Sequence, residues 1–339
     1  MLVDLRSDTV TRPTAAMRRA MADAEVGDDQ YGEDPTVSAL EEEAAGLLGK
    51  EAALYVVSGT MGNQLALRTL TRPGDAVLVG ARQHVVLYED GAGPLNAGVS
   101  WVELADGDGS VDPDQVRQAA VGDDYHQARA SLVAVEDTHM ASGGRVWPRA
   151  RRQAVAAVAA EHGLRVHLDG ARLWHAAVAN ATTPAAVAEG CDTVMCCLSK
   201  ALGAPIGSLL AGPADVISAA RFERHRMGGA WRQAGVVAAA GLVALRTMLP
   251  RLADDHLRAR RLAVAVAERW PDAGLDPEAV DTNIVVFPHP APAVLVAHLE
   301  AEGVRAGTVA PGWMRLVTHY DVDDAGIERA VKAIAAAPV

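Results

Sequence analysis

Lys200 is the residue of this chain best suited to amine chemistry. The 339 residues include three lysines, Lys50, Lys200 and Lys332, and arginine supplies the rest of the 31 basic residues. Lys200 stands between an apolar run and a Gly/Pro-rich turn in "CCLSKALGAPIGS", residues 196–208. A desolvated lysine can lose its proton and become a nucleophile, which arginine cannot do. A capping or snorkelling lysine is the alternative reading of this position.

The stretch "SGTMGN", residues 58–63, is a candidate phosphate site. Ser58, Gly59 and Thr60 follow an apolar strand pattern and open a helical one, so they offer hydroxyls, backbone N–H groups and a helix N-terminus. The stretch lacks the G-K-[ST] of a P-loop and the glycine spacing of a dinucleotide fingerprint, which argues against a nucleoside triphosphate or NAD. An ordinary helix N-cap is the alternative.

Asp169 ends another predicted strand and precedes Lys200 by 200 − 169 = 31 residues, enough for a helix and a return strand. In open α/β sheets, ligands bind beyond the carboxyl ends of the strands, so we expect Asp169, Lys200 and the 58–60 stretch in one crevice. Pyridoxal phosphate requires a phosphate site, a carboxylate for its ring nitrogen and a Schiff-base lysine. The order of these residues therefore predicts a pyridoxal phosphate enzyme.

The elements that would position these residues alternate between strand and helix. Short apolar runs at 52–57, 75–80, 130–137 and 164–169, with "TVMCCLSK" and "GSLLAG", are separated by helical patterns. Continuous apolar strands of this kind predict an α/β fold with a mostly parallel central sheet and helices on both faces. Near residue 250 the pattern changes to a long amphipathic helix followed by strand, helix, strand and helix. We expect a large domain at 1–248 and a small C-terminal α/β lobe at 249–339.

Composition excludes several classes of partner. The net charge is −12 with dispersed acidic residues, which does not support binding to nucleic acid or an anionic membrane. No apolar run approaches the roughly 20 residues of a membrane span, and the start "MLVDLRSDTV" does not resemble a signal peptide, so we expect a cytoplasmic protein. Cys191, Cys196 and Cys197 lack C-x-x-C spacing, and we expect structural thiols and no metal site.

Eight ordered segments resemble the pyridoxal-phosphate-dependent L-threonine aldolases, members of the fold type I group that contains aspartate aminotransferase. They are "DLRSDTVTRPT", "GDDQYGEDPTV", "SGTMGNQLAL", "EDTHMASGGRVWP", "HLDGARLWHA", "LSKALGAPIGS", "RHRMGGAWRQAG" and "RLVTH". The resemblance covers nearly the whole chain. It implies a lyase that cleaves L-threonine, L-allo-threonine or a related β-hydroxy-α-amino acid to glycine and an aldehyde.

The resemblance also implies roles for single residues. Lys200 would carry the Schiff base, Asp169 would bind the pyridine nitrogen, and Arg172 would contact the phenolic oxygen and the substrate. His84 matches a histidine that stacks on the ring, and His139 matches one near the substrate hydroxyl; either would act as the base. The phosphate would bind Ser58, Gly59 and Thr60.

Substrate and subunit contacts follow from the same resemblance. Arg315, helped by Ser7, would bind the α-carboxylate through a fork geometry that lysine cannot reproduce. Tyr31 and the cofactor-binding Arg232 match positions that reach a neighbouring subunit's site, which implies a homotetramer built as a dimer of dimers. The family commonly has "ENTHN" where this chain has "EDTHM", and glycines with a methionine where this chain has "GGAWRQ". Asp137, Met140 and Trp231 are therefore departures that bear on substrate preference.

Two other functions fit the same residues. A β-eliminating lyase or a transaldolase that passes a glycine carbanion to another aldehyde, acting on a bulkier β-hydroxy amino acid, would use the same scaffold. A cofactor-binding protein without catalysis is the second alternative, although it need not keep Lys200, Asp169 and Arg315 together.

Overall fold

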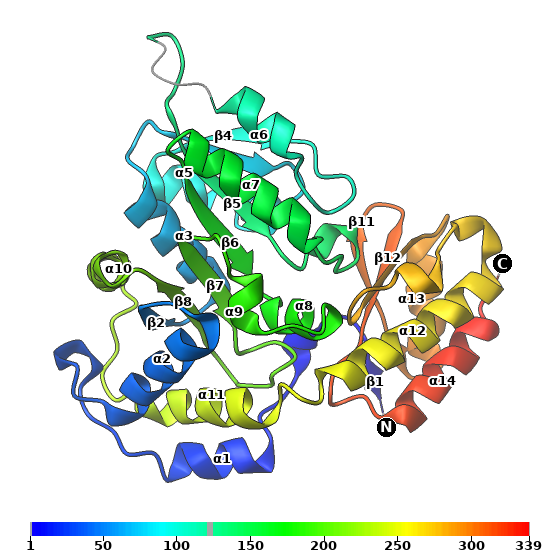
Figure 1. The fold of residues 1–339 in the computed structure, drawn as a ribbon. Coiled ribbons are helices and arrows are strands. Elements are labelled where there is room, and N and C mark those ends of the chain that lie inside the picture. The colour runs from blue at the N-terminus through cyan, green and yellow to red at the C-terminus, as the bar shows by residue number, and fades with distance from the viewer. Residues whose placement is uncertain (1, 121–124, 339) are drawn as a thin grey trace.

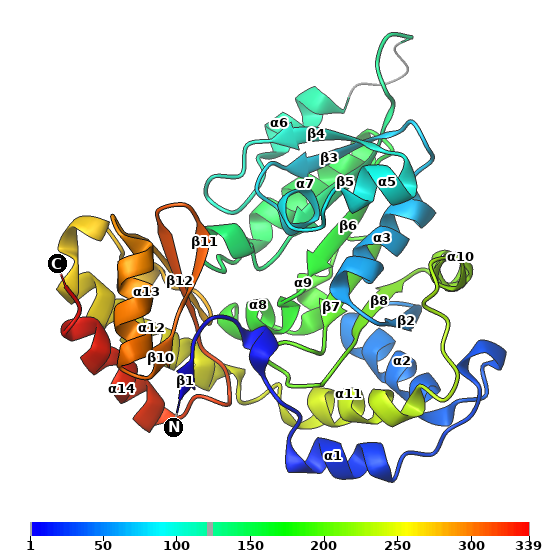
Figure 2. The same ribbon diagram turned by 180° about the vertical axis from the view of Figure 1, so that it is seen from behind.

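The computed structural model describes residues 2–120 and 125–338. Its largest element is a seven-stranded sheet in the order β2-β8-β7-β6-β5-β3-β4, with helices on both sides (Figures 1 and 2). Neighbouring strands in the run β7-β6-β5-β3-β4 are all parallel to each other. Strand β8 runs antiparallel to both of its neighbours, β7 and β2. The strands are β2 Ala52–Val56, β3 Ala76–Gly80, β4 Ser100–Leu104, β5 Ala130–Glu136, β6 Arg165–Gly170, β7 Thr193–Cys197 and β8 Ser208–Gly212.

The central strands are buried on both faces, which explains their continuous apolar sequences. Side chains alternate between two cores along each strand. Cys196 packs into the core shared with α2, α7 and α11, and Cys197 packs into the core shared with α3 and α10. The two neighbouring thiols therefore point to opposite faces, and all three cysteines are free and buried.

The helices that cover the sheet begin and end at the residues that local chemistry favours. In α2 the carboxylate of Asp34 accepts the N–H groups of Thr36 and Val37, Pro35 occupies the first turn, and Gly49 ends the helix at φ 63°. The helices of this part are α1 Ala15–Ala22, α2 Pro35–Leu48, α3 Gly59–Leu70, α4 His84–Leu87, α5 Ala92–Ala97, α6 Pro113–Ala119, α7 Arg149–Glu161, α8 Leu173–Ala179, α9 Pro184–Val187, α10 Ala214–Arg226 and α11 Gly235–Thr247.

A second hydrophobic cluster lies at the side of the molecule where the C-terminal elements gather (Figure 1). It draws residues from β9 Ile284–Pro288, β10 Val304–Arg305, β12 Trp313–Val317, α12 Leu252–Arg269, α13 Pro292–Ala301 and α14 Asp324–Ala335. Strand β11, Gly307–Ala310, pairs with β12 beside this cluster. The N-terminal strand β1, Val3–Asp4, pairs in parallel with β10, and Val3 and Leu5 belong to this cluster. The first residues of the chain thus pack with the last ninety before the chain crosses to α1 (Figure 2).

The predicted α/β fold with a mostly parallel sheet is confirmed. Strands β1, β4, β10 and β11 were not expected, since two of them have two residues each and the half-exposed "SWVEL" of β4 lacks a continuous apolar run. Among the described residues, no single helix has the length and hydropathy to cross a membrane. Among these residues, only α11 and α12 taken together have the required length and hydropathy, and the two helices are bent by 74° relative to each other.

Candidate active site

Lys200 and Asp169 lie at the carboxyl ends of two neighbouring parallel strands. Asp169 is the penultimate residue of β6 and is 4% exposed, and Lys200 follows β7 by three residues. The carbonyl of Lys200 accepts a hydrogen bond from the hydroxyl of Thr11 (2.8 Å). The positive charge of Lys200 helps to lower the pKa of Asp8 and opposes protonation of His84. Its ammonium therefore lies within electrostatic reach of both residues.

The predicted phosphate site forms the start of α3. Ser58 is the N-cap and its hydroxyl accepts the N–H of Met61 (3.1 Å). The N–H groups of Gly59 and Thr60 head the helix, where no intrahelical acceptor exists, and they remain available to an anion. A Cβ at Gly59 would lie 3.0 Å from the sulfur of Cys197. Glycine at this position therefore lets the helix start lie directly on β7, the strand that leads to Lys200.

A hydrogen-bond network joins His84 to Asp169 at the end of the sheet. Nδ1 of His84 lies 3.1 Å from Oε1 of the buried Glu89, and the Asn63 amide donates to both Glu89 and Asp169 (2.8 Å each). One ligand atom from each of His84, Glu89 and Asp169 lies within 4.8 Å of the others. The amide oxygen of Asn63 accepts a hydrogen bond from Nε2 of His167. Burial lowers the pKa of His167 to about 4. Neutral His167 thus fixes the orientation of Asn63.

The environment of His84 leaves one ring nitrogen free. Burial opposes protonation of His84, but the hydrogen bond to Glu89 and the charges of Asp169 and Glu136 outweigh it and raise its pKa. Because Glu89 accepts the Nδ1 proton, Nε2 is the basic nitrogen of neutral His84. Nε2 has no hydrogen-bond partner among the described residues.

His139 occupies a different environment from His84. Its side chain is 1% exposed, Nε2 lies 3.2 Å from Asp106, and Nδ1 lies 2.8 Å from the hydroxyl of Ser142. Both ring nitrogens are therefore occupied. His139 lies just after the end of β5, but its ring is hydrogen-bonded to Asp106 in the loop after β4 and to Ser142 in its own turn.

Arg172 forms a buried, two-pronged ion pair with Asp8. Its Nε and Nη2 donate to the two carboxylate oxygens at 2.8 and 2.6 Å. Burial alone would raise the pKa of Asp8, but Arg172 and Lys200 lower it well below its usual range. The neighbouring Ser7 caps the short 3₁₀ helix Asp8–Val10 and accepts hydrogen bonds from Thr9. The N-terminal segment thus carries a negative charge to the crevice.

Arg315 is partly buried and has few acceptors. Nη2 donates to the carbonyl of Arg6 (3.1 Å), Nη1 lies 3.5 Å from the sulfur of Met140, and buried Nε has no partner among the described residues. Burial and the nearby charge of Arg172 lower the pKa of Arg315. A guanidinium in this state is suited to bind a carboxylate.

An apolar cleft of about 490 Å³ lies beside these residues. Trp313 and Arg315 occupy alternate positions of β12 and so share one face, and the rings of Tyr88 and His84 are 5.6 Å apart. The lining includes Arg82, Leu87, Tyr88, Ser142, Val286 and Trp313. The cleft therefore offers space for an uncharged group next to Arg315.

Tyr31 and Arg232 lie together on the surface, away from the hydrogen-bond network of the crevice. Tyr31 is 78% exposed, and Arg232 donates to its neighbours Gln30 and Asp28. Neither makes a hydrogen bond to Lys200, Asp169 or Arg315 within the described chain. Trp231 packs edge-on against Tyr55 at a ring distance of 4.9 Å, so this partly buried departure lies against the core.

Asp137, the departure next to His139, also points into the core. It is fully buried and accepts a hydrogen bond from Arg152 of α7 at 2.8 Å. Burial raises the pKa of Asp137 to about 7, against the opposing charge of Arg152. Met140 is the departure that contacts Arg315, the residue expected to bind the substrate carboxylate.

Sequence reasoning did not identify Asp8, Asn63 and Glu89. All three are at most 4% exposed. Asn63 lies one helical turn after Gly59, and Glu89 lies five residues after His84, so each could have been found as a polar residue on the buried side of a local element. The partner of Asp8 is 164 residues away and gives no local signal.

Known proteins match this chain over nearly its whole length. Residues 4–289 match the model of the beta-eliminating lyase family. This chain belongs to that family. It is 40% identical over 324 residues to the low specificity L-threonine aldolase of Escherichia coli K12, covering 95% of each chain. It is 39% identical to the low-specificity L-threonine aldolase 1 of Arabidopsis thaliana, covering 94% of this chain and 92% of the relative. The prediction of a lyase of the L-threonine aldolase family is confirmed.

A solved structure confirms the fold. The threonine aldolase of Leishmania major superposes with a TM-score of 0.82 at 21% identity, covering 98% of each chain. At this identity the likeness concerns the fold alone. It agrees with the fold type I architecture expected for this family member.

Proposed function

We propose that this protein is a pyridoxal-phosphate-dependent aldolase that cleaves L-threonine, L-allo-threonine or a related β-hydroxy-α-amino acid to glycine and an aldehyde. The observation that carries the proposal is the convergence of Lys200, Asp169 and His84 at the carboxyl ends of β7, β6 and β3, with Arg315 nearby. The name of its 40% identical relative, low specificity L-threonine aldolase, supports the reaction.

The residues of the crevice fit pyridoxal phosphate. Gly59 and Thr60 supply uncommitted N–H donors for a phosphate, and the buried Asp169 supplies a carboxylate held by Asn63 and by the N–H of Ala171 (3.0 Å). Lys200 would hold the aldehyde carbon and Arg172 the phenolic oxygen. When bound, the cofactor supplies an electron sink for the electron pair released by cleavage of the Cα–Cβ bond.

The chain's own residues would orient the substrate and move its proton. Arg315 binds the α-carboxylate, with Ser7 nearby on the N-terminal segment. Nε2 of His84 takes the proton of the β-hydroxyl, because it is the free nitrogen of a ring whose tautomer Glu89 sets. His139, with both nitrogens occupied, holds the loop of Asp106 and the turn of Ser142 in place.

The cleft beside Arg315 favours one alternative. Its apolar lining could accept a β-substituent larger than the methyl group of threonine, so a lyase or transaldolase for a bulkier β-hydroxy amino acid is the second candidate. A catalytically inactive cofactor-binding protein would not require the free nitrogen of His84 or the uncommitted donors of Arg315.

Assembly and location are part of the proposal. Tyr31 and Arg232 are exposed side by side, which suits contribution to a neighbouring copy's site in a homotetramer built from two dimers. We also propose a cytoplasmic protein without nucleic-acid or membrane partners, organised as residues 1–248 and 249–339. The packing of Val3 and Leu5 with the C-terminal cluster makes the first strand an addition to the smaller unit.

The test is product release from L-threonine and L-allo-threonine by the pyridoxal-loaded protein. Equimolar glycine and acetaldehyde, absent with Lys200→Ala, would establish the aldolase, and the ratio of rates would define its preference at Cβ. Pyruvate and ammonia from β-substituted substrates would favour elimination. Labelled product from threonine and an added aldehyde would favour transfer. Cofactor uptake without any reaction of a β-hydroxy amino acid would contradict the proposal.

A further inference from the structure

Met140 lies against the guanidinium of Arg315 and is held in place from two sides. Its backbone N–H donates to the buried carboxylate of Glu136 at 2.8 Å, just beyond the end of β5. Met140 is 7% exposed, and its side chain packs with Ile284 of β9 and Val317 of β12. Met140 therefore presents its sulfur to Arg315 in a defined position, 3.5 Å from Nη1.

The contact leaves Arg315 short of acceptors. A thioether sulfur is a weak hydrogen-bond acceptor, so Nη1 makes no strong bond to it. Nη2 reaches the carbonyl of Arg6, and Nε has no partner among the described residues. Burial and the nearby charge of Arg172 also lower the pKa of Arg315. A carboxylate could therefore accept hydrogen bonds from Nη1 and Nε of Arg315 without displacing a stronger acceptor.

We propose that Met140 is a positioning residue that keeps Arg315 dry and uncommitted for the substrate carboxylate. The inference rests on the proposed function, because it requires that Arg315 bind this group. An amide at position 140 would place a strong acceptor oxygen beside Nη1, and that hydrogen bond would compete with the carboxylate. The competition would weaken binding and leave the step that breaks the Cα–Cβ bond unchanged.

The experiment compares Met140→Asn with Met140→Leu in the pyridoxal-loaded protein. Glycine and glycinamide are titrated while the absorbance of the bound cofactor is followed, since glycinamide has the amine without the carboxylate. Met140→Asn should raise the Kd of glycine about tenfold or more, the scale of one hydrogen bond to a charged group. The Kd of glycinamide should stay within about twofold, since it tests packing without the carboxylate. The KM for a cleaved amino acid should rise with glycine's Kd while kcat stays nearly constant.

The matched variant and the two ligands separate positioning from damage. Met140→Leu keeps the apolar packing without an acceptor and should match the natural protein with both ligands. Equal weakening of glycine and glycinamide by Met140→Asn, or no change in glycine binding, would overturn the inference. If Met140→Asn weakens glycine but not glycinamide, yet the natural protein releases no aldehyde from any β-hydroxy amino acid, the aldolase proposal fails while the role of Met140 stands.

Discussion

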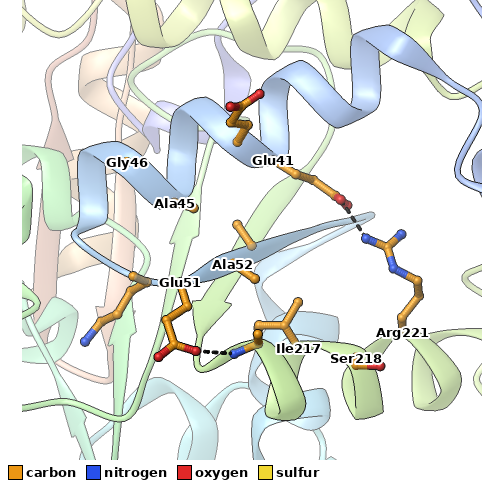
Figure 3. Close-up of a pocket in the computed structure, with 12 residues that line it drawn as sticks. Glu41, Ala45, Gly46, Glu51, Ala52, Ile217, Ser218 and Arg221 are labelled. Atoms are coloured by element: carbon orange, nitrogen blue, oxygen red, sulfur yellow. Dashed lines mark hydrogen bonds and ion pairs between the residues drawn. The ribbon is translucent and has the colours of Figure 1, made fainter.

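The crevice beyond β5, β6 and β7 and the pocket at the free edge of β2 both gather acidic and basic side chains, but they leave them in different states. In the edge pocket, Arg221 donates to Glu41 at 2.6 Å and Glu51 accepts the N–H of Ala214 at 2.9 Å (Figure 3). Lys50 donates to the carbonyls of Ala188 and Cys191. Each of these charges has a partner supplied by the fold.

The crevice keeps atoms without partners. The ammonium of Lys200, Nε2 of His84 and Nε of Arg315 make no hydrogen bond to the residues that the structure describes. Such groups cost stability unless a ligand or water satisfies them. The crevice also holds paired charges, Asp169 and Arg172, so the feature that distinguishes it from the edge pocket is the cluster of donors and acceptors left open beside them.

The edge pocket has a structural purpose that its pairings explain. Strand β2 forms one edge of the seven-stranded sheet. The N–H of Tyr55 in this strand donates to Glu41, and the carbonyl of Tyr55 accepts a hydrogen bond from Arg224. Both backbone groups of Tyr55 are thereby occupied by side chains. Capping of this kind protects a sheet edge from pairing with another chain.

The two lysines give the largest contrast. Lys200→Ala should lower aldehyde release by roughly 1000-fold or more, because no other amine replaces the Schiff-base nucleophile. Lys50→Ala removes two hydrogen bonds to backbone carbonyls and should leave the rate within about twofold. Product formation measured at equal cofactor loading compares the two variants. Equal rates for the two variants would remove the functional distinction between the crevice and the edge pocket.

Asp169→Ala should have the next largest effect. The cofactor's ring nitrogen would lose its charged partner, and the rate should fall on the order of 100-fold, as for the loss of one preorganised electrostatic contact. Cofactor uptake should persist in part, because the phosphate donors of α3 are untouched. Turnover and absorbance are measured on the same sample. Turnover near that of the natural protein would refute the role of Asp169.

Glu89→Gln should reduce the rate on the order of tenfold, less than the full contribution of a positioned base. The carboxylate of Glu89 helps to raise the pKa of His84, so its removal should lower that pKa. Neutral His84 is the active form and is lost as the pH falls through its pKa. The acid limb of the kcat/KM profile should therefore move to lower pH in Glu89→Gln. A limb that stays in place would show that His84 is not the base.

Glu41→Gln tests the edge pocket and should have the smallest effect on catalysis. It weakens the contact with Arg221 and should lower the free energy of unfolding by about 1–3 kcal/mol, with activity unchanged. Denaturant unfolding and the aldolase assay measure the two quantities. Loss of activity in a fully folded Glu41→Gln protein would show that the edge pocket has a functional role as well.

Local patterns predicted the parts of the site that depend on strand ends. The apolar runs before Asp169 and Lys200, and the helix start at Ser58, could be found because each signal lies within ten residues. The role of Lys200 also followed from its rarity in an arginine-rich chain. The N-terminal strand and the partner of Asp8 could not be found in this way, since they pair with β10 and Arg172 far along the chain.

The sequence by itself determined the fold class, the order of the buried apolar strands along the chain and the lysine, aspartate and phosphate stretch at their ends, because hydrophobic periodicity and turn residues act over short distances. Only the tertiary structure decided the state of each charged group. It paired His139 with Asp106, turned Asp137 toward Arg152 and set Met140 against Arg315. These outcomes depend on which distant side chains share a desolvated space, where partners and burial together fix charge and availability.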